Sequence, residues 1–361
     1  LQHTESNLPL IEPNMPTNMN GNSRYAEDIT RWKKGEVLGQ GAFGIVYLGL
    51  NNDTGELMAV KQMSTEEVSA KELKTLKNEI DLLRKLQHPN IVRSIGTEVT
   101  PSALSIFLEY IPGGSLKSLI EKFGFLAEPV VRTYGRQLLL GLEYLHRSGI
   151  AHRDIKGANC LVGNDGVVKL ADFGASKTWR SQATVTVSGG GSPLSNKTGE
   201  ITGTPSWMAP EVIRDAQSDK QIPWKKADIW SLGCTVLEMT TGKPPWHQFT
   251  NQVTVLYHIA CSEIIPEFPD NPTEEMSVFL SSCLRREPSQ RPDATSLLLF
   301  PFVAAGINVG RQGTAIGVPG AILVRPTTVS TETIGETCED FANWRVGTAF
   351  AGASRVGTTS E

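Results

Sequence analysis

The chain has 361 residues, of which 39% are hydrophobic and 20% charged, enough apolar material for one large domain or two ordinary ones. The net charge of −4 gives no reason to expect a nucleic-acid partner, and no apolar run reaches the about 18 residues that membrane insertion needs. Five cysteines without C-x-x-C spacing argue against a disulfide framework or a zinc site, so we expect reduced thiols in a cytoplasmic protein.

The first third of the chain predicts mainly β-strands. Residues 1–31 begin with Leu rather than Met, which suggests a fragment, and their Asn-, Pro-, Thr- and Ser-rich composition predicts disorder. Strand-like alternation around a glycine-rich turn follows, and apolar runs predict further strands over 57–63, 91–95 and 104–110. Between them, leucines and isoleucines recur at three- and four-residue steps, which predicts a helix over 66–87.

Helical periodicity dominates after the turn Pro112-Gly113-Gly114. The predicted helices cover 115–122, 128–147, 226–241, 251–261, 273–284 and 293–299. A β part followed by an α part predicts an α+β fold of two lobes, with a hinge over 109–114 and a ligand site between the lobes. Residues 303–361 are rich in Gly, Thr and Ser and predict a flexible tail.

Three glycines, Gly39, Gly41 and Gly44, mark the first turn in the run G-Q-G-A-F-G-I-V. This spacing alone is ambiguous, because dinucleotide-binding folds share it, with a helix after the glycines and an acid about 20 residues on. Here a strand-like run follows, and Lys61 stands where the acid would be. The context favours a β-hairpin whose backbone amides close over phosphate groups, which glycine permits because it has no Cβ.

The stretch 150–174 holds the groups best suited to catalysis, on two short loops joined by a predicted hairpin. Asp154 can accept a proton from an incoming hydroxyl, and Lys156 can steady a phosphoryl group as a point charge. Asn159 and Asp172 offer hard oxygen ligands, which suit Mg²⁺ bound to phosphates.

Taken in order, the glycine run, A-V-K, H-R-D-I-K-G-A-N and D-F-G resemble a eukaryotic protein kinase. The resemblance implies a protein-kinase fold over 32–302, with a β-rich N-lobe over 32–110 and an α-helical C-lobe over 111–302. It also implies transfer of the γ-phosphoryl group of ATP to protein hydroxyls, with ATP and Mg²⁺ as cofactors. Lys156 in K-G-A-N resembles the serine/threonine class, and so does Thr204, which would brace the catalytic aspartate and the lysine.

The same resemblance implies an ATP site. Lys61 would contact the α- and β-phosphates and pair with Glu79, for which a solvated helix glutamate is the alternative. Leu108 would lie behind the adenine, whose edge would bond to backbone groups near Glu109 and Ile111. The residues implied in ATP binding are Leu38, Gly39, Gln40, Gly41, Ala42, Phe43, Gly44, Ile45, Val46, Ala59, Lys61, Glu79, Leu108, Glu109 and Ile111.

The segment that follows D-F-G predicts regulation. Arg153 would pair with a phosphate on this segment, with Thr202 as the first candidate and Ser206 as the second. A glycine-rich stretch near 188–198 makes the segment longer than such kinases generally show. It could carry phosphorylation sites or be a tolerated surface insertion.

Two further contacts are implied within the predicted C-lobe. Glu211 of A-P-E would pair with Arg291, and Asp228 would bond to the catalytic-loop backbone.

Several strings, among them F-L-E-Y-I-P-G-G-S-L, T-G-T-P-S-W-M-A-P-E-V and D-I-W-S-L-G-C-T-V-L-E-M, resemble the mitogen-activated protein kinase kinase kinase group. That resemblance implies a mitogen-activated protein kinase kinase as substrate and partner, within a signalling cascade. Two alternatives stay open: a related serine/threonine kinase with other substrates, and a pseudokinase scaffold. The second would be favoured by loss of Lys61, Asp154, Asn159 or Asp172, and all four are present.

Overall fold

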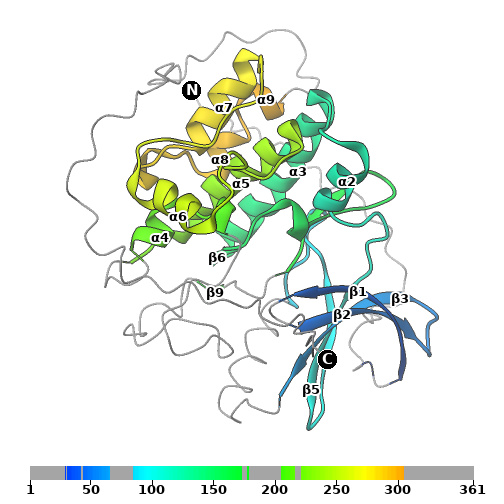
Figure 1. Ribbon diagram of the computed structural model, residues 1–361. Coiled ribbons are helices and arrows are strands. Elements are labelled where there is room, and N and C mark those ends of the chain that lie inside the picture. The colour runs from blue at the N-terminus through cyan, green and yellow to red at the C-terminus, as the bar shows by residue number, and fades with distance from the viewer. Residues whose placement is uncertain are drawn as a thin grey trace, which may run out of the picture.

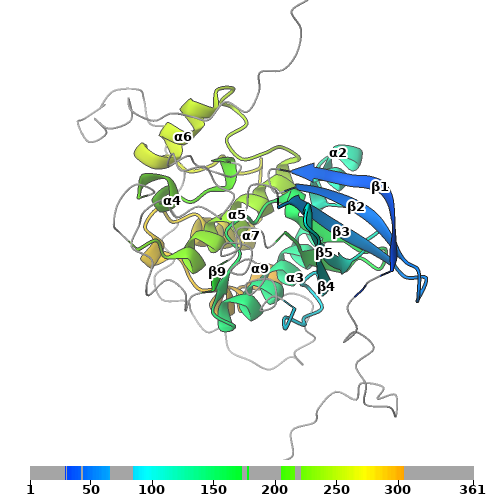
Figure 2. The same cartoon turned by 90° about the horizontal axis from the view of Figure 1, so that it is seen from below.

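The computed structural model describes residues 29, 31–41, 44–65, 84–172, 177–178, 205–215 and 221–304 (Figure 1). Within these residues a five-stranded antiparallel sheet precedes a helical part. Figure 1 shows the sheet below the helices, and Figure 2 shows the same two parts from below. The predicted α+β fold of two lobes is therefore confirmed. Nearly all of the two terminal segments that we predicted to be disordered lies outside the described residues.

The N-lobe sheet has the strand order β1-β2-β3-β5-β4. Its strands are β1 (Trp32–Gly41), β2 (Gly44–Asn51), β3 (Leu57–Ser64), β4 (Ser94–Val99) and β5 (Ala103–Glu109). Alternation separates its two faces, because successive side chains of a strand point to opposite sides. Met58, Val60 and Phe107 form a small core on one face, with the Trp32 ring packed edge-on against Phe107.

Two predicted boundaries in this lobe are wrong for the same reason. The strand predicted over 91–95 begins only at Ser94, and Ile91 makes a single bridge to Leu170. The helix predicted over 66–87 does not reach its predicted end, because residues 84–88 are turn and irregular chain, while 66–83 lie outside the described residues. Leu86 and Ile91 are apolar because they belong to the large core of the helical lobe, whatever their local backbone.

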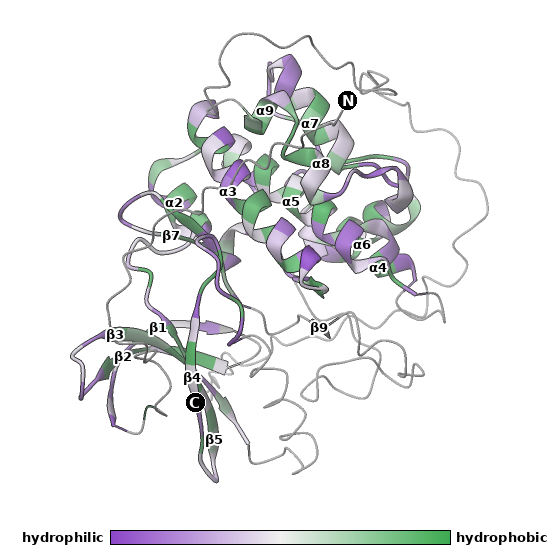
Figure 3. Cartoon of the chain, turned by 180° about the vertical axis from the view of Figure 1, so that it is seen from behind, coloured by the Kyte–Doolittle hydropathy of each residue, from purple (hydrophilic) through white to green (hydrophobic). Residues whose placement is uncertain are grey.

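The C-lobe is built from helices around one central helix. Its helices are α2 (Leu116–Phe123), α3 (Glu128–Arg147), α4 (Pro210–Arg214), α5 (Trp224–Thr241), α6 (Gln252–Cys261), α7 (Glu274–Cys283), α8 (Ala294–Leu297) and α9 (Pro301–Ala304). Every residue of α5 from Ala227 to Met239 is buried, as expected of a helix enclosed on all sides (Figure 3). Helix α9 continues past residue 302 and buries Val303.

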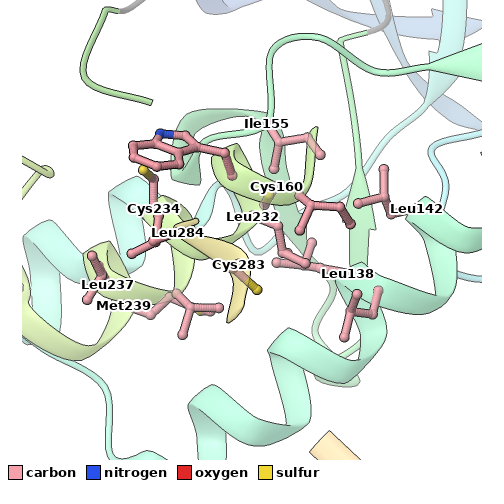
Figure 4. Packing of buried hydrophobic residues seen from close by; sticks show 14 of the residues in the cluster. Leu138, Leu142, Ile155, Cys160, Leu232, Cys234, Leu237, Met239, Cys283 and Leu284 are labelled. Carbon is pink, nitrogen blue, oxygen red and sulfur yellow. The ribbon is translucent and has the colours of Figure 1, made fainter. Parts of the chain in front are cut away.

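Side chains from three helices meet in the C-lobe core. Leu138 of α3, Leu232 of α5 and Cys283 of α7 are fully buried and lie close together in Figure 4. Cys160, Cys234 and Cys283 are free thiols whose pKa burial raises, in agreement with the prediction. Cys261 lies at the end of α6 and is only partly buried. It contradicts the prediction of reduced thiols, because it is disulfide-bonded.

A series of short elements carries the loops predicted to be catalytic. They are β6 (Ile150–Ala151), a 3-10 turn (Gly157–Asn159), β7 (Cys160–Val162), β8 (Val168–Leu170), β9 (Lys177–Thr178) and a second 3-10 turn (Pro205–Trp207). The predicted hairpin is β7–β8, and β9 pairs with β6. In the part of the chain that the structure describes, no helix is both long and apolar enough to cross a membrane.

Candidate active site

Two predicted groups, Lys156 and Asn159, bind the carboxylate of Asp154. Lys156 Nζ donates to both of its oxygens, at 3.0 Å and 2.8 Å. Asn159 Nδ2 donates to Asp154 Oδ2 at 2.7 Å and to the Asp154 carbonyl at 2.8 Å. The side chains of Asp154 and Lys156 are only about a fifth exposed, so the carboxylate is held in one orientation and still reaches solvent.

Asp172 is brought to the same place by the β7–β8 hairpin. The amide of Ala171 donates to the Asn159 carbonyl at 2.8 Å, which ties the two loops together. From the N-lobe, Lys61 Nζ donates to Asp172 Oδ1 and forms an ion pair between the lobes. The partner predicted for Lys61, Glu79, lies outside the described residues.

Asn159 and Asp172 fit the predicted Mg²⁺ role in their chemistry. Because the amide nitrogen of Asn159 donates to Asp154, its oxygen Oδ1 is the Asn159 atom that could ligate a cation, and Asp172 could contribute its carboxylate. Among the described residues there is no group of three or more His, Cys, Asp or Glu that could hold a metal alone. Two hard oxygen donors match Mg²⁺ in particular, which keeps several waters and is shared with substrate phosphates.

Two residues of the site have backbone angles that L-amino acids rarely adopt. Arg153 has φ of 72° and Asp172 has φ of 62°, and such residues cost about 1–3 kcal/mol each. Asp228 of α5 stabilises the first of them: its carboxylate accepts the amides of Arg153 at 2.7 Å and His152 at 2.9 Å. The predicted bond from Asp228 to the catalytic-loop backbone is therefore confirmed, and His146 Nε2 contacts the same carboxylate at 2.8 Å.

His152 and the hairpin share a further link. Its ring is fully buried, and its Nε2 lies 3.0 Å from the carbonyl oxygen of Ala171, next to Asp172. A histidine held this way packs the two loops against each other.

Four of the residues predicted to bind ATP share one face of the N-lobe sheet, whereas Ile45 and Glu109 lie on the other face. Val46 lies opposite Lys61, and Ala59 lies opposite Leu108. Directly opposed residues share a face, and so do residues two apart in a strand, which places all four side chains on the same side. It is the side from which Lys61 reaches Asp172.

The glycine-rich turn joins β1 and β2, where Gly39 lies opposite Val46 and Gly41 opposite Gly44. Leu38 to Gly41 are on β1 and Gly44 to Val46 on β2, while Ala42 and Phe43 lie outside the described residues. Gly44 has φ of 120°, and a Cβ there would lie 2.2 Å from the Gln62 carbonyl oxygen. This position therefore requires glycine on two independent grounds.

Replacing Gly44 by Ala should distort the hairpin, because the left-handed angle and the clash with Gln62 both oppose a Cβ. Strain of this kind amounts to about 1–3 kcal/mol. We expect the KM for ATP to rise several-fold in a steady-state kinase assay. Gly55→Ala is the control, because it has φ of 74° but no atom near its added Cβ and lies in the distant β2–β3 turn. An equal KM change in both variants would contradict the prediction.

In the predicted hinge, Glu109 forms hydrogen bonds within the protein through both its amide and its side chain. The amide of Glu109 donates to the Arg93 carbonyl at 3.0 Å, and its carboxylate accepts Lys169 Nζ at 2.9 Å and 3.0 Å. Both groups of Glu109 are therefore engaged within the protein, which narrows the predicted adenine contact to its carbonyl and to backbone groups of Ile111. The Lys169 contact was not predicted, because nothing local in β8 distinguishes this lysine from a solvated one.

Glu211 and Arg291 form a buried bidentate ion pair. Arg291 Nη1 and Nη2 each donate to a different Glu211 oxygen at 2.7 Å, and both side chains are at most 2% exposed. The predicted pair is confirmed. Thr202 and Thr204 lie outside the described residues, whereas Arg153 stacks on the Trp224 ring at 4.2 Å.

The sequence reasoning also missed Glu238. Its carboxylate accepts the amide of Gly157 at 2.9 Å and Trp207 Nε1 at 3.0 Å. The available signal was a carboxylate within the otherwise apolar run of α5, since an acidic residue is rarely buried without partners.

Comparison with known proteins places these groups in context. The protein kinase domain family matches residues 32–303. The chain is 50% identical over 279 residues to mitogen-activated protein kinase kinase kinase 2 of Arabidopsis thaliana, covering 76% of this chain and 41% of that protein. It is 46% identical over 278 residues to mitogen-activated protein kinase kinase kinase A of Dictyostelium discoideum, covering 76% and 28%. For mitogen-activated protein kinase kinase kinase 19 of Homo sapiens the identity is 41% over 286 residues, covering 78% and 21%. The chain thus spans less than half the length of these relatives.

Proposed function

This chain belongs to the protein kinase family, and from that premise we propose that it transfers the γ-phosphoryl group of ATP to serine or threonine hydroxyls of proteins. One observation carries the proposal. Asp154 is held by Lys156 and Asn159, while Asp172 is tied to Asn159 through the neighbouring amide of Ala171. The cluster thus contains a proton acceptor, Asp154, with the cation of Lys156 next to it. It also contains two side chains that could ligate a metal through oxygen, Asn159 and Asp172.

Each group has a chemical task in that reaction. Asp154 accepts the proton of the substrate hydroxyl as the hydroxyl attacks the γ-phosphorus. Lys156 stabilises charge that develops on the phosphoryl oxygens, and Lys61 holds the phosphates from the N-lobe. Bound at Asn159 and Asp172, Mg²⁺ would neutralise phosphate charge. Placement and charge stabilisation supply most of the rate in phosphoryl transfer.

ATP would lie under the glycine-rich hairpin, against the sheet face described above. Val46 and Ala59 supply apolar contact for the base, and Leu108 lies behind it. The glycines at 39, 41 and 44 bring backbone amides close to the phosphates. Glu79 would brace Lys61 from the helix predicted over 66–87.

The substrate is proposed to be a mitogen-activated protein kinase kinase, because the similar proteins are named as mitogen-activated protein kinase kinase kinases. The cytoplasm is proposed as the location because the cysteines lack C-x-x-C spacing. Arg153 would bind a phosphate on the activation segment, with Thr202 as the proposed site and Thr204 as a brace for Asp154 and Lys156. These assignments follow the kinase resemblance and the position of Arg153 beside the proposed base.

The test is a panel of purified mitogen-activated protein kinase kinases, each kinase-dead, incubated with the chain and Mg²⁺–ATP. We expect phosphate on activation-loop serine or threonine residues of at least one of them, mapped by mass spectrometry. A generic acceptor such as myelin basic protein is assayed in parallel. Transfer to the generic acceptor alone would contradict the proposed substrate, and no transfer to any acceptor would contradict the proposed enzyme.

A further inference from the structure

Helix α5 binds the catalytic loop, residues 152–157, on both sides of Asp154. Asp228 accepts the amides of His152 and Arg153, before Asp154, and Glu238 accepts the amide of Gly157, after Lys156. The two carboxylates lie ten positions apart along α5, and both are buried. The proposed base therefore lies in a loop that is fixed by two carboxylates of one rigid helix.

Glu238 differs from Asp228 because it also binds a second segment. Its Oε2 accepts both the Gly157 amide at 2.9 Å and the Trp207 indole N–H at 3.0 Å. Only 5% of the residue is exposed, and burial raises the pKa of Glu238, while these two hydrogen bonds oppose that rise. Buried carboxylates need such donors, because an unpaired one is strongly destabilising.

Gly157 is the residue that lets this carboxylate approach. A Cβ at this position would lie 2.7–2.8 Å from the carboxylate atoms of Glu238, closer than side-chain carbons approach in proteins. Glycine thus leaves room for the carboxylate directly against the loop. The preceding residue, Lys156, binds Asp154 through its Nζ, so a shift at Gly157 would move the cation that faces the proposed base.

Trp207 is fixed to α5 at two points. Its indole N–H binds Glu238, and its carbonyl accepts the hydroxyl of Ser231 at 2.8 Å. The residue ends a 3-10 turn that leads directly into Ala209-Pro210-Glu211 and the buried Glu211–Arg291 pair. One oxygen atom of Glu238 therefore joins the end of the activation segment to the loop that carries Asp154.

We propose that Glu238 is a positioning residue that couples the segment around Trp207 to Lys156 and Asp154, so that the placement of that segment sets the rate of phosphoryl transfer. The inference rests on the proposed function for its kinetic consequence. Its structural part, the coupling of two segments through one carboxylate, does not depend on the reaction.

A double-mutant cycle tests the coupling, with Trp207→Phe, Glu238→Gln and the double variant. Phe keeps the ring and removes only the N–H, whereas Gln replaces the carboxylate by a neutral amide, whose oxygen makes weaker hydrogen bonds to the two donors. Each single variant should lower kcat about ten-fold or more, with the KM for ATP within about two-fold. The double variant should be no slower than Glu238→Gln, because both changes act on the same connection.

Trp32→Phe is the matched control, because Trp32 Nε1 donates to Glu98 Oε2 at 3.1 Å in the N-lobe, the same kind of bond far from the catalytic loop. Its kcat should stay within about two-fold of the parent, since the bond that it breaks lies in the N-lobe, away from the catalytic loop. Losses that multiply in the double variant, or an unchanged kcat in Glu238→Gln, would overturn the proposal.

Amide hydrogen exchange gives a readout that needs no activity. In Glu238→Gln, peptides covering 152–160 and 205–212 should exchange faster, while those covering 94–109 should not change. Equal acceleration in both lobes would indicate general destabilisation and overturn the proposal, as would unchanged exchange over 152–160. If the parent chain transfers no phosphate, the proposed function fails, and exchange alone still decides whether Glu238 connects the two segments.

Discussion

Replacing Asp154 by Asn is expected to lower kcat about 10²–10⁴-fold, the range that a positioned general base contributes, while ATP still binds. An amide cannot accept the proton of the substrate hydroxyl, and it removes the negative partner of Lys156 Nζ, 2.8 Å away. The rest of the site keeps its supports, since Asp228 binds the backbone of the loop and not the carboxylate of Asp154. Steady-state kinetics, with ATP binding measured by calorimetry, checks both halves of the expectation.

Asp165→Asn is the control for that experiment. Asp165 is an exposed aspartate in the turn of the β7–β8 hairpin, where its Oδ1 accepts the Val167 amide at 3.0 Å. The same chemical change there should leave kcat within about two-fold, since surface substitutions of this kind have small effects. If Asp154→Asn retained more than about a tenth of the parent activity, general-base catalysis by Asp154 would have to be abandoned.

Replacing Arg291 by Met should destabilise the C-lobe by about 3–5 kcal/mol, because it leaves the Glu211 carboxylate buried without its cation. Arg291 also donates to the carbonyls of Arg285 at 2.6 Å and Lys226 at 2.8 Å, which would lose a donor as well. For a domain of this size the melting temperature should fall by roughly 10 °C. Urea unfolding, followed by tryptophan fluorescence, measures the free energy of unfolding directly.

Two variants separate the buried charge from the change of side chain. Arg147→Met removes an exposed arginine, 79% accessible, from its pair with Glu143, and should lose less than about 1 kcal/mol. Adding Glu211→Gln to Arg291→Met should recover part of the loss, because a neutral amide is less costly to bury than a carboxylate. Similar losses for Arg291→Met and Arg147→Met would show that burial of the pair has no special weight.

Periodicity predicted the lobes well and their borders poorly. The run of apolar steps that became α3 lies within one lobe, and there the predicted range, 128–147, equals the observed one. Leu86 and Ile91 carry the same apolar signal, but they join the C-lobe core from outside its helices. The apolar pattern of the local sequence predicts that a residue is buried. It does not predict which part of the protein covers that residue.

The sequence by itself determined the group around Asp154, because Lys156 and Asn159 follow within five positions and one loop suffices to gather them. Through the kinase resemblance it also identified Glu211 with Arg291 and the role of Asp228, and the tertiary structure confirmed both. Only the tertiary structure decided that Lys61 meets Asp172, 111 positions away, and that Glu238 reaches Gly157 across 81. Contacts at such separations depend on how helices and strands pack together. The periodicity of the local sequence does not predict this packing, because it depends only on neighbouring residues.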